Sequence, residues 1–331
     1  MSIQNRHASG SLAAMPHFQE LLEQIALTHP ALGDSTRNLE IAWQSGDRRD
    51  AELTELIAQC IQQCVLADLF PLRGVLDAFS SFSKDFFERQ FDYLHSGEYR
   101  AKDYSEVVKA VYSDNAYMCS VYYPALLLSY LCSPNYRHIF RQLDSAVARW
   151  QALDCRRVLD LAGGHGFLLL HTLHQLPAAV GLEVDLSASA QTFSQRLQQV
   201  TGWGEGRFEC QIRDFFDADP SLIEPFDAAI CCELLEHLPE PRRALTALHA
   251  HIRPSGRLFV TAAIRMESID HLTLFKTTEE LVELLDDTGF ELLSDHSVPF
   301  VLKRPSSPER WQRQLVDPML PATFVAECRR R

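Results

Sequence analysis

The feature that most constrains the fold is a regular alternation of short apolar runs with helical patterns, which begins near residue 150. The apolar runs cover residues 157–161, 179–184, 208–212, 228–232 and 257–262. Helical patterns separate them at about 167–175, 185–200 and 242–251, and another follows at 279–288. Short, nearly continuous apolar runs are typical of parallel strands buried on both faces. The alternation therefore predicts an α/β fold, a doubly wound sheet with helices on both faces, which residues 290–294 and 323–328 would complete.

The first 150 residues show a different pattern. Apolar residues recur at helical spacing between 53 and 65, and further helical patterns cover 76–94, 105–112, 116–131 and 136–153. We therefore expect an all-helical cap or substrate-pocket segment over 1–150 and a Rossmann-like catalytic domain over 151–331. The stretch 299–321 contains five prolines and is expected to form a long loop or insertion.

Charge and composition disfavour several classes of binding partner. The formal net charge is −13, and no run of Lys and Arg offers a basic groove, so we expect no nucleic-acid substrate. No run approaches the roughly 20 apolar residues needed to span a bilayer, so we expect no membrane partner. The nine cysteines include no Cys-x-x-Cys pair. This usage indicates reduced thiols in a cytoplasmic protein, with neither disulfides nor a metal site.

A glycine-rich loop follows the first apolar run. Asp160 lies near the end of that run, and Gly163-Gly164-His165-Gly166 leads into the next helical pattern. Ligands of an open parallel sheet bind beyond the carboxyl ends of its strands, where the strand order reverses. Glycines there allow a tight turn and close approach of a ligand to a helix N-terminus. By itself such a loop is also compatible with a dinucleotide-binding enzyme.

Three further blocks end the next strands. Asp185 offers a carboxylate that can accept both hydroxyls of a ribose. Asp214 and Phe215 follow the third run, where they offer a carboxylate for an adenine amino group and an aromatic wall for its ring. Glu233 and Leu234 follow the fourth run.

In this order and spacing, the four blocks resemble the class I S-adenosylmethionine-dependent methyltransferases over about residues 150–331. The glycines read Gly-Gly-x-Gly rather than Gly-x-Gly-x-x-Gly, which disfavours NAD. The resemblance implies S-adenosylmethionine as cofactor. It assigns the methionine moiety to Asp160 and the loop of Gly163, Gly164, His165 and Gly166, the ribose to Asp185 with Leu186, adenine to Asp214 and Phe215, and the sulfonium side to Glu233 and Leu234.

A tyrosine cluster marks the helical half, where four of the nine tyrosines lie between residues 112 and 123. Aromatic rings near a sulfonium gain about 0.5–2 kcal/mol each from cation–π attraction when water is excluded. We therefore take Tyr112, Tyr117 and Tyr123, with Glu233, as catalytic candidates. A tyrosine-rich helix interface without a ligand is the alternative, and the N-terminal helices could equally form a homodimer surface.

Three activities remain open from the sequence. Methyl transfer is an in-line displacement that depends on orientation more than on a base, and a small molecule of specialised metabolism is the expected acceptor. The helical cap with its tyrosines is also similar to what azetidine-2-carboxylate synthases would need, which cyclise S-adenosylmethionine and release methylthioadenosine. The third alternative is a cofactor-binding pseudoenzyme subunit. His237 is a candidate base, although Glu-His-Leu-Pro is common at this point in the family that the chain resembles, where this histidine is more often structural.

Overall fold

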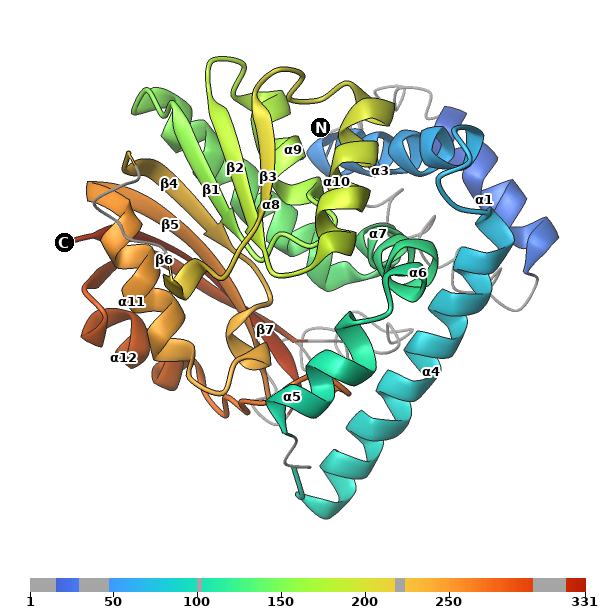
Figure 1. Cartoon of the computed structure of the whole chain (residues 1–331). Helices are drawn as coiled ribbons and strands as arrows, with labels where there is room; N and C mark the ends of the chain where they lie inside the picture. Colours follow the sequence, from blue (N-terminus) through green and yellow to red (C-terminus); the bar gives the residue numbers. More distant parts are fainter. Residues whose placement is uncertain (1–15, 30–47, 100–102, 218–223, 300–319) are drawn as a thin grey trace, which may run out of the picture.

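A seven-stranded sheet forms the centre of the described part of the computed structural model, which covers residues 16–29, 48–99, 103–217, 224–299 and 320–331 (Figure 1). The strand order is β3-β2-β1-β4-β5-β7-β6, and β7 runs antiparallel to both of its neighbours. The strands are β1 (Arg157–Leu161), β2 (Val180–Asp185), β3 (Phe208–Ile212), β4 (Phe226–Cys231), β5 (Ile252–Ile264), β6 (Phe290–Pro299) and β7 (Ala322–Arg330). The predicted Rossmann-like sheet is therefore confirmed.

The strand order reverses between β1 and β4. The chain crosses from β1 to β2 on one side and returns to β4 on the other, and both pair with β1 in parallel. In register, Asp160 lies opposite Glu183 of β2 and Ile230 of β4. The reversal therefore places the loop after β1 at the edge where open sheets bind ligands.

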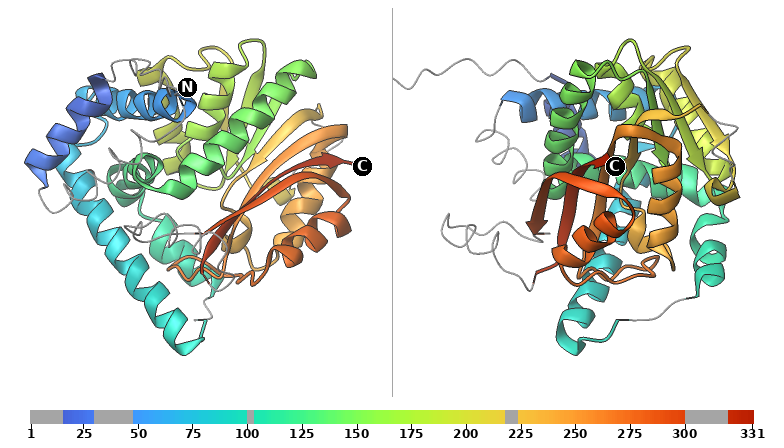
Figure 2. Two further views of the ribbon diagram at one scale, coloured as in Figure 1. Left: turned by 180° about the vertical axis from the view of Figure 1, so that it is seen from behind. Right: turned by 90° about the vertical axis from the view of Figure 1, so that its left-hand side faces the viewer.

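Helices cover both faces of the sheet (Figures 1 and 2). Consecutive side chains of a strand point to opposite faces, and in β1 Val158 belongs to one apolar core while Leu159 belongs to the other. The first core includes residues of α8 (Pro134–Ala152), α9 (Phe167–Gln175) and α10 (Ala188–Thr201). The second includes residues of α11 (Pro241–His251) and α12 (Thr278–Asp287).

The described helices that precede α8 in the chain lie beside the sheet and form the cap. They are α1 (Pro16–Thr28), α3 (Arg48–Leu66), α4 (Leu72–Ser96), α5 (Tyr104–Val107), η2 (Val108–Tyr112), α6 (Asn115–Tyr117), η3 (Met118–Tyr122) and α7 (Tyr123–Cys132). The segments η2 and η3 are π-helical turns, which occur often at functional sites. Asp114 separates them, and its carboxylate accepts the Tyr117 main-chain N–H at 2.9 Å.

One apolar core joins the cap to the sheet, because it extends from Phe18 of α1 to Val325 of β7. Helix α8 spans residue 150 and packs on β5, β6 and β7. The division of the chain at residue 150 stays a prediction. Most of the proline-rich stretch 299–321 lies outside the described residues. None of the described helices has the length and apolar character required to cross a membrane.

Candidate cofactor and acceptor site

The loop after β1 requires glycine at several positions. Gly164 and Gly166 have φ angles of 62° and 73°, in the left-handed region that disfavours a side chain. A Cβ atom on Gly163 would lie 2.7 Å from Oδ2 of Asp160. The loop therefore turns tightly over the end of β1, and α9 begins directly after Gly166.

Asp185 at the end of β2 connects this loop to the neighbouring strand. Its Oδ2 accepts the Gly164 N–H at 3.2 Å, and its Oδ1 accepts the Ser187 N–H at 2.8 Å. Burial raises its pKa, while these hydrogen bonds oppose the rise. Asp185 and the adjacent exposed Leu186 both line the main cavity of the site.

Two buried polar atoms at the loop have no hydrogen-bond partner among the described residues. One is Oδ2 of Asp160, whose pKa is raised to about 7 by burial and by Asp185. The other is Nε2 of His165. The Nδ1 of His165 accepts the Phe167 N–H at 3.2 Å, and burial lowers the pKa of this imidazole to about 3, so a neutral ring carries its proton on Nε2. Oδ2 of Asp160 could therefore accept a hydrogen bond from the ammonium of an amino acid, and Nε2 of His165 could donate one to its carboxylate.

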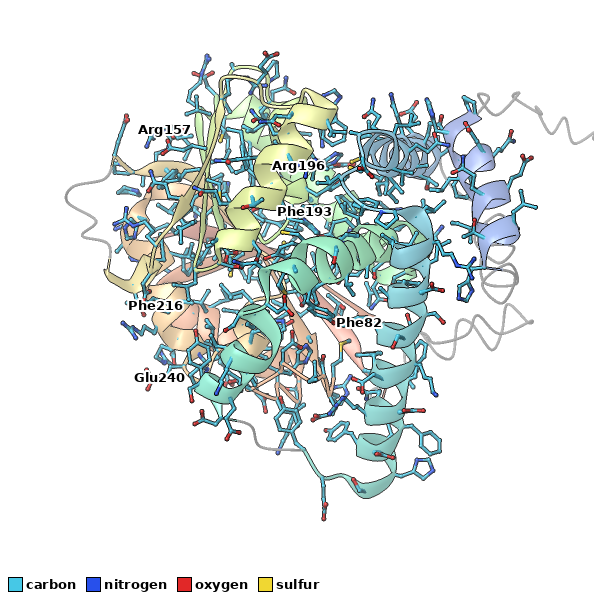
Figure 3. All side chains as sticks on the ribbon, turned by 45° about the vertical axis from the view of Figure 1, so that its right-hand side comes forward. Phe82, Arg157, Phe193, Arg196, Phe216 and Glu240 are labelled. Carbon is cyan, nitrogen blue, oxygen red and sulfur yellow. The ribbon has the colours of Figure 1, made fainter. Side chains whose placement is uncertain are left out.

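The cavity that begins at this loop has a volume of about 1290 Å³. It continues from Gly163 and Asp185 past the tyrosine cluster to α4, where Phe82 faces the interior of the molecule (Figure 3). Its aromatic wall consists of Phe79, Phe82, Phe86, Phe87, Tyr104, Tyr112, Tyr122, Tyr123, Tyr130 and Tyr136. The residues predicted to bind the cofactor and an aromatic chamber thus line one cavity.

The predicted tyrosines occupy different environments. Tyr123 is buried in the cavity wall, with its ring 6.3 Å from that of His165. Tyr112 also lines the cavity and donates its hydroxyl hydrogen to Oδ2 of Asp270 at 2.9 Å. Tyr117 is 40% exposed and is not among the residues of the cavity wall. Tyr112 ends η2 and Tyr123 begins α7, whereas Tyr117 ends α6, which follows the break at Asp114.

Glu233 and Leu234 line the cavity beyond the end of β4. Glu233 has a φ of 48°, and its carboxylate accepts the Thr261 hydroxyl at 2.7 Å. Burial raises its pKa, although the Thr261 hydroxyl opposes the rise. The structure thus brings Glu233 to the same chamber as the glycine loop, as the sequence predicts.

Asp214 and Phe215 are not among the residues that line this cavity. Oδ1 of Asp214 accepts the Phe216 N–H at 2.9 Å, closing a local turn. The Phe215 ring is buried in the second core, 4.5 Å from the ring of His251. The adenine assignment stays a prediction, and the position of Phe215 does not support it.

Several residues of the chamber have no counterpart in the predicted site. Asp270 and His271 lie in the segment after β5, which carries no recognisable motif, and Glu236 lies one turn beyond Glu233. Asp270 is buried, which opposes its ionisation, yet the neighbouring His237 and His271 hold its pKa below the ordinary value. Only the folded chain brings this segment against the tyrosines of the cap.

Comparison with known proteins adds a domain assignment. Residues 159–258 match the family model described as a methyltransferase domain. The ubiquinone biosynthesis O-methyltransferase of Neisseria meningitidis serogroup A is 24% identical over 131 residues, 39% of this chain and 53% of that protein. Its counterpart from Xylella fastidiosa is 34% identical over 110 residues, 33% of this chain and 42% of that protein. The chain thus spans about half the length of the curated relatives that it matches.

Solved structures with similar folds include the mitomycin 7-O-methyltransferase MmcR, with a TM-score of 0.48 and 15% identity, covering 78% of this chain and 70% of that one. The cyclase SpnF has a TM-score of 0.45 and 20% identity, covering 59% of this chain and 82% of that one. The domain match is in keeping with the glycine loop, Asp160 and Asp185, which line one cavity at the carboxyl ends of the strands. The chain therefore contains a methyltransferase domain, has the fold of a methyltransferase-type enzyme, and uses S-adenosylmethionine as its cofactor.

Proposed function

We propose that the protein transfers the methyl group of S-adenosylmethionine to a hydroxyl oxygen of a small, largely apolar acceptor. The observation that carries this proposal is the size and continuity of the cavity. Its volume of about 1290 Å³ exceeds the roughly 300–1,000 Å³ of ordinary small-molecule pockets. One end of the cavity is lined by the residues that we expect to bind the cofactor, so the remaining volume suits a second molecule.

The chamber walls define the chemical class of that molecule. Phe79, Phe82 and Phe86 of α4 line the cavity together with tyrosines of η2, η3 and α7, and the Phe82 ring meets that of Tyr122 edge to face. Aromatic walls bind flat apolar rings through burial and through edge-to-face contacts. The names of the curated relatives, which are O-methyltransferases, support a hydroxyl as the attacking group.

The chain's own residues act by binding, orientation and exclusion of water. When bound, S-adenosylmethionine supplies a methyl group activated by its positive sulfur. A bond forms between the acceptor oxygen and the methyl carbon while the sulfur–carbon bond breaks, and the hydroxyl proton is released. Burial raises the pKa of Tyr122, Tyr123 and Tyr130, so these phenols stay neutral. They surround the reacting groups with aromatic faces rather than with a base.

Cyclisation of the cofactor to azetidine-2-carboxylate is the second candidate. The enclosure formed by Tyr122, Tyr123, Tyr130 and Tyr136 is compatible with it, since aromatic rings around a sulfonium would serve either reaction. The extra volume toward α4 favours methyl transfer, because cyclisation needs no second substrate.

The test follows the products of purified protein by mass spectrometry, first with S-adenosylmethionine alone and then with a panel of hydroxylated aromatic compounds. S-adenosylhomocysteine that forms only with an acceptor is the expected result. Methylthioadenosine together with the mass of azetidine-2-carboxylate, formed from the cofactor alone, would overturn the proposal in favour of cyclisation. Tight cofactor binding without turnover of any compound would favour a pseudoenzyme instead.

A further inference from the structure

Three side chains in the chamber wall form a set of metal-ligand type. Glu236, His237 and His271 each offer one carboxylate oxygen or ring nitrogen, and these atoms all lie within 4.8 Å of one another. All three residues line the same cavity as the glycine loop. The rings of His237 and His271 lie 4.9 Å apart in an edge-on arrangement.

In both imidazoles, Nδ1 lies beside a main-chain oxygen. Nδ1 of His237 lies 3.0 Å from the main-chain oxygen of Asp270, and Nδ1 of His271 lies 3.0 Å from that of Met266. A carbonyl oxygen can only accept, so each neutral ring carries its hydrogen on Nδ1. The lone pair then resides on Nε2. Histidines that bind metals are held in this way, with the second nitrogen donating to a carbonyl or a carboxylate.

Glu236 supplies an independent indication of a ligand. Its side chain is 1% exposed, and neither carboxylate oxygen has a hydrogen-bond partner within the described part of the chain. Leaving a buried carboxylate without partners is costly. Its main-chain oxygen, in contrast, accepts the N–H groups of Leu272 and Thr273. The backbone at Glu236 is therefore anchored beside the segment that carries His271, while its carboxylate remains available.

Asp270 completes the surroundings of the set. Its Oδ2 lies 3.6 Å from Nδ1 of His237 and accepts the hydroxyl of Tyr112, and its Oδ1 accepts the hydroxyl of Ser268. A hydrogen-bonded carboxylate behind a histidine fixes the ring and increases its basicity toward a metal. This segment thus resembles the outer support of a metal site in its chemistry.

We propose that Glu236, His237 and His271 bind one divalent transition-metal ion of the Zn²⁺ or Co²⁺ class. Two imidazoles with one carboxylate suit such ions, whereas Mg²⁺ prefers oxygen ligands. Three protein ligands leave at least one position open toward the cavity. The acceptor's hydroxyl oxygen binds the metal at this open position, and the metal lowers the pKa of that hydroxyl. This role of the metal rests on the proposed methyl transfer. The proposal replaces the expectation, drawn from the cysteine pattern, that the chain has no metal site.

The experiment measures metal binding directly. The purified full chain is freed of metal and titrated with Co²⁺ and Zn²⁺ by calorimetry, and the cobalt form is examined by visible absorption. We expect one equivalent to bind, with the visible bands of a low-coordinate cobalt site. Glu236→Gln and His271→Gln should each weaken binding at least about tenfold. His95→Gln, which changes an exposed histidine of α4, is the matched control and should bind as the wild type does.

Binding of S-adenosylhomocysteine by the same variants shows whether they are folded. Absence of stoichiometric binding by the wild type would overturn the proposal, as would unchanged affinity in both site variants that still bind S-adenosylhomocysteine. The readout does not require an acceptor. Metal binding without methyl transfer would therefore contradict the proposed function and leave the metal site intact.

Discussion

At the carboxyl end of β2, the Asp185 carboxylate already accepts N–H groups from Gly164 and Ser187. The same carboxylate faces the cavity, where it can accept the two hydroxyls of a ribose. Hydrogen bonds to a charged group contribute about 1.5–3 kcal/mol each. We therefore expect Asp185→Ala to weaken binding of S-adenosylmethionine at least about tenfold, as measured by calorimetry. Thermal unfolding would show that the variant remains folded.

A matched change at Asp214 provides the control. Its carboxylate closes a local turn and is not part of the cavity wall. Asp214→Ala should therefore reduce cofactor affinity less than Asp185→Ala does. An equal loss in both variants would restore the adenine role predicted for Asp214, and unchanged affinity in Asp185→Ala would refute the ribose assignment.

Asp160 predicts a pH dependence of cofactor binding. Its pKa is raised to about 7 by burial and by Asp185, and the buried Glu183 beside it also has a raised pKa. Asp160 is therefore mostly protonated below pH 7 and ionised above it. The methionine ammonium is mostly positive below about pH 7.7, so attraction should appear as the pH rises through the pKa of Asp160 toward that value. We expect affinity for S-adenosylmethionine, measured by calorimetry, to increase from about pH 6 to about pH 7.5.

The variant Asp160→Asn separates this carboxyl from the other titrating groups. It should bind with an affinity that changes little over the same range, because the amide does not ionise. A slope equal to that of the wild type would assign the pH dependence to another group, such as Asp185.

Much of the site could be predicted wherever a residue lies at or near the carboxyl end of a strand. Asp160, Asp185 and Glu233 are placed by the ends of β1, β2 and β4, and all three line one cavity. The direction of a side chain one residue further along depends on loop conformation. Phe215 therefore lies in the core, and neither Asp214 nor Phe215 lines the cavity.

At the level of elements, the strands agree closely with the apolar runs because buried parallel strands need continuous apolar sequence. The strand β3 and the helix α9 have the predicted bounds. The strand β5 begins at Ile252, earlier than predicted, since the Pro254–Gly256 turn is included within it. The position of the cap over the sheet could not be predicted, because helical periodicity shows which face is apolar but not which element it meets.

The aromatic face of α4 leads to a prediction about the acceptor. Phe82 lines the chamber far from the glycine loop, with its ring 6.1 Å from that of Tyr122. We expect Phe82→Ala to raise the KM for an aromatic acceptor several-fold and to leave the affinity for S-adenosylmethionine unchanged. Steady-state kinetics and calorimetry measure the two quantities. A loss of cofactor affinity with an unchanged acceptor KM would place the acceptor elsewhere.

On the scale of the whole molecule, the cap and the sheet share one apolar core and are joined by buried polar contacts. Trp150 of α8 is fully buried and donates its ring N–H to Glu327 of β7 at 3.1 Å, and Arg149 forms an ion pair with the same carboxylate. Gln90 of α4 donates to the main-chain oxygen of Arg265, after β5. The change of sequence pattern near residue 150 therefore coincides with a change of secondary structure within a shared apolar core.

The outer face of α4 bears on the homodimer expected from the sequence. Phe91 and Leu94 lie about one turn apart on this helix and are 60% and 45% exposed. Apolar patches of this kind mark interaction surfaces, so we expect two copies to associate through α4, as measured by light scattering after size exclusion. Phe91→Lys should then give a monomer, because it buries a charge in the interface. Leu293→Lys, the same change at an exposed residue of β6, should leave the dimer intact, and a wild-type monomer would show that this face serves another purpose.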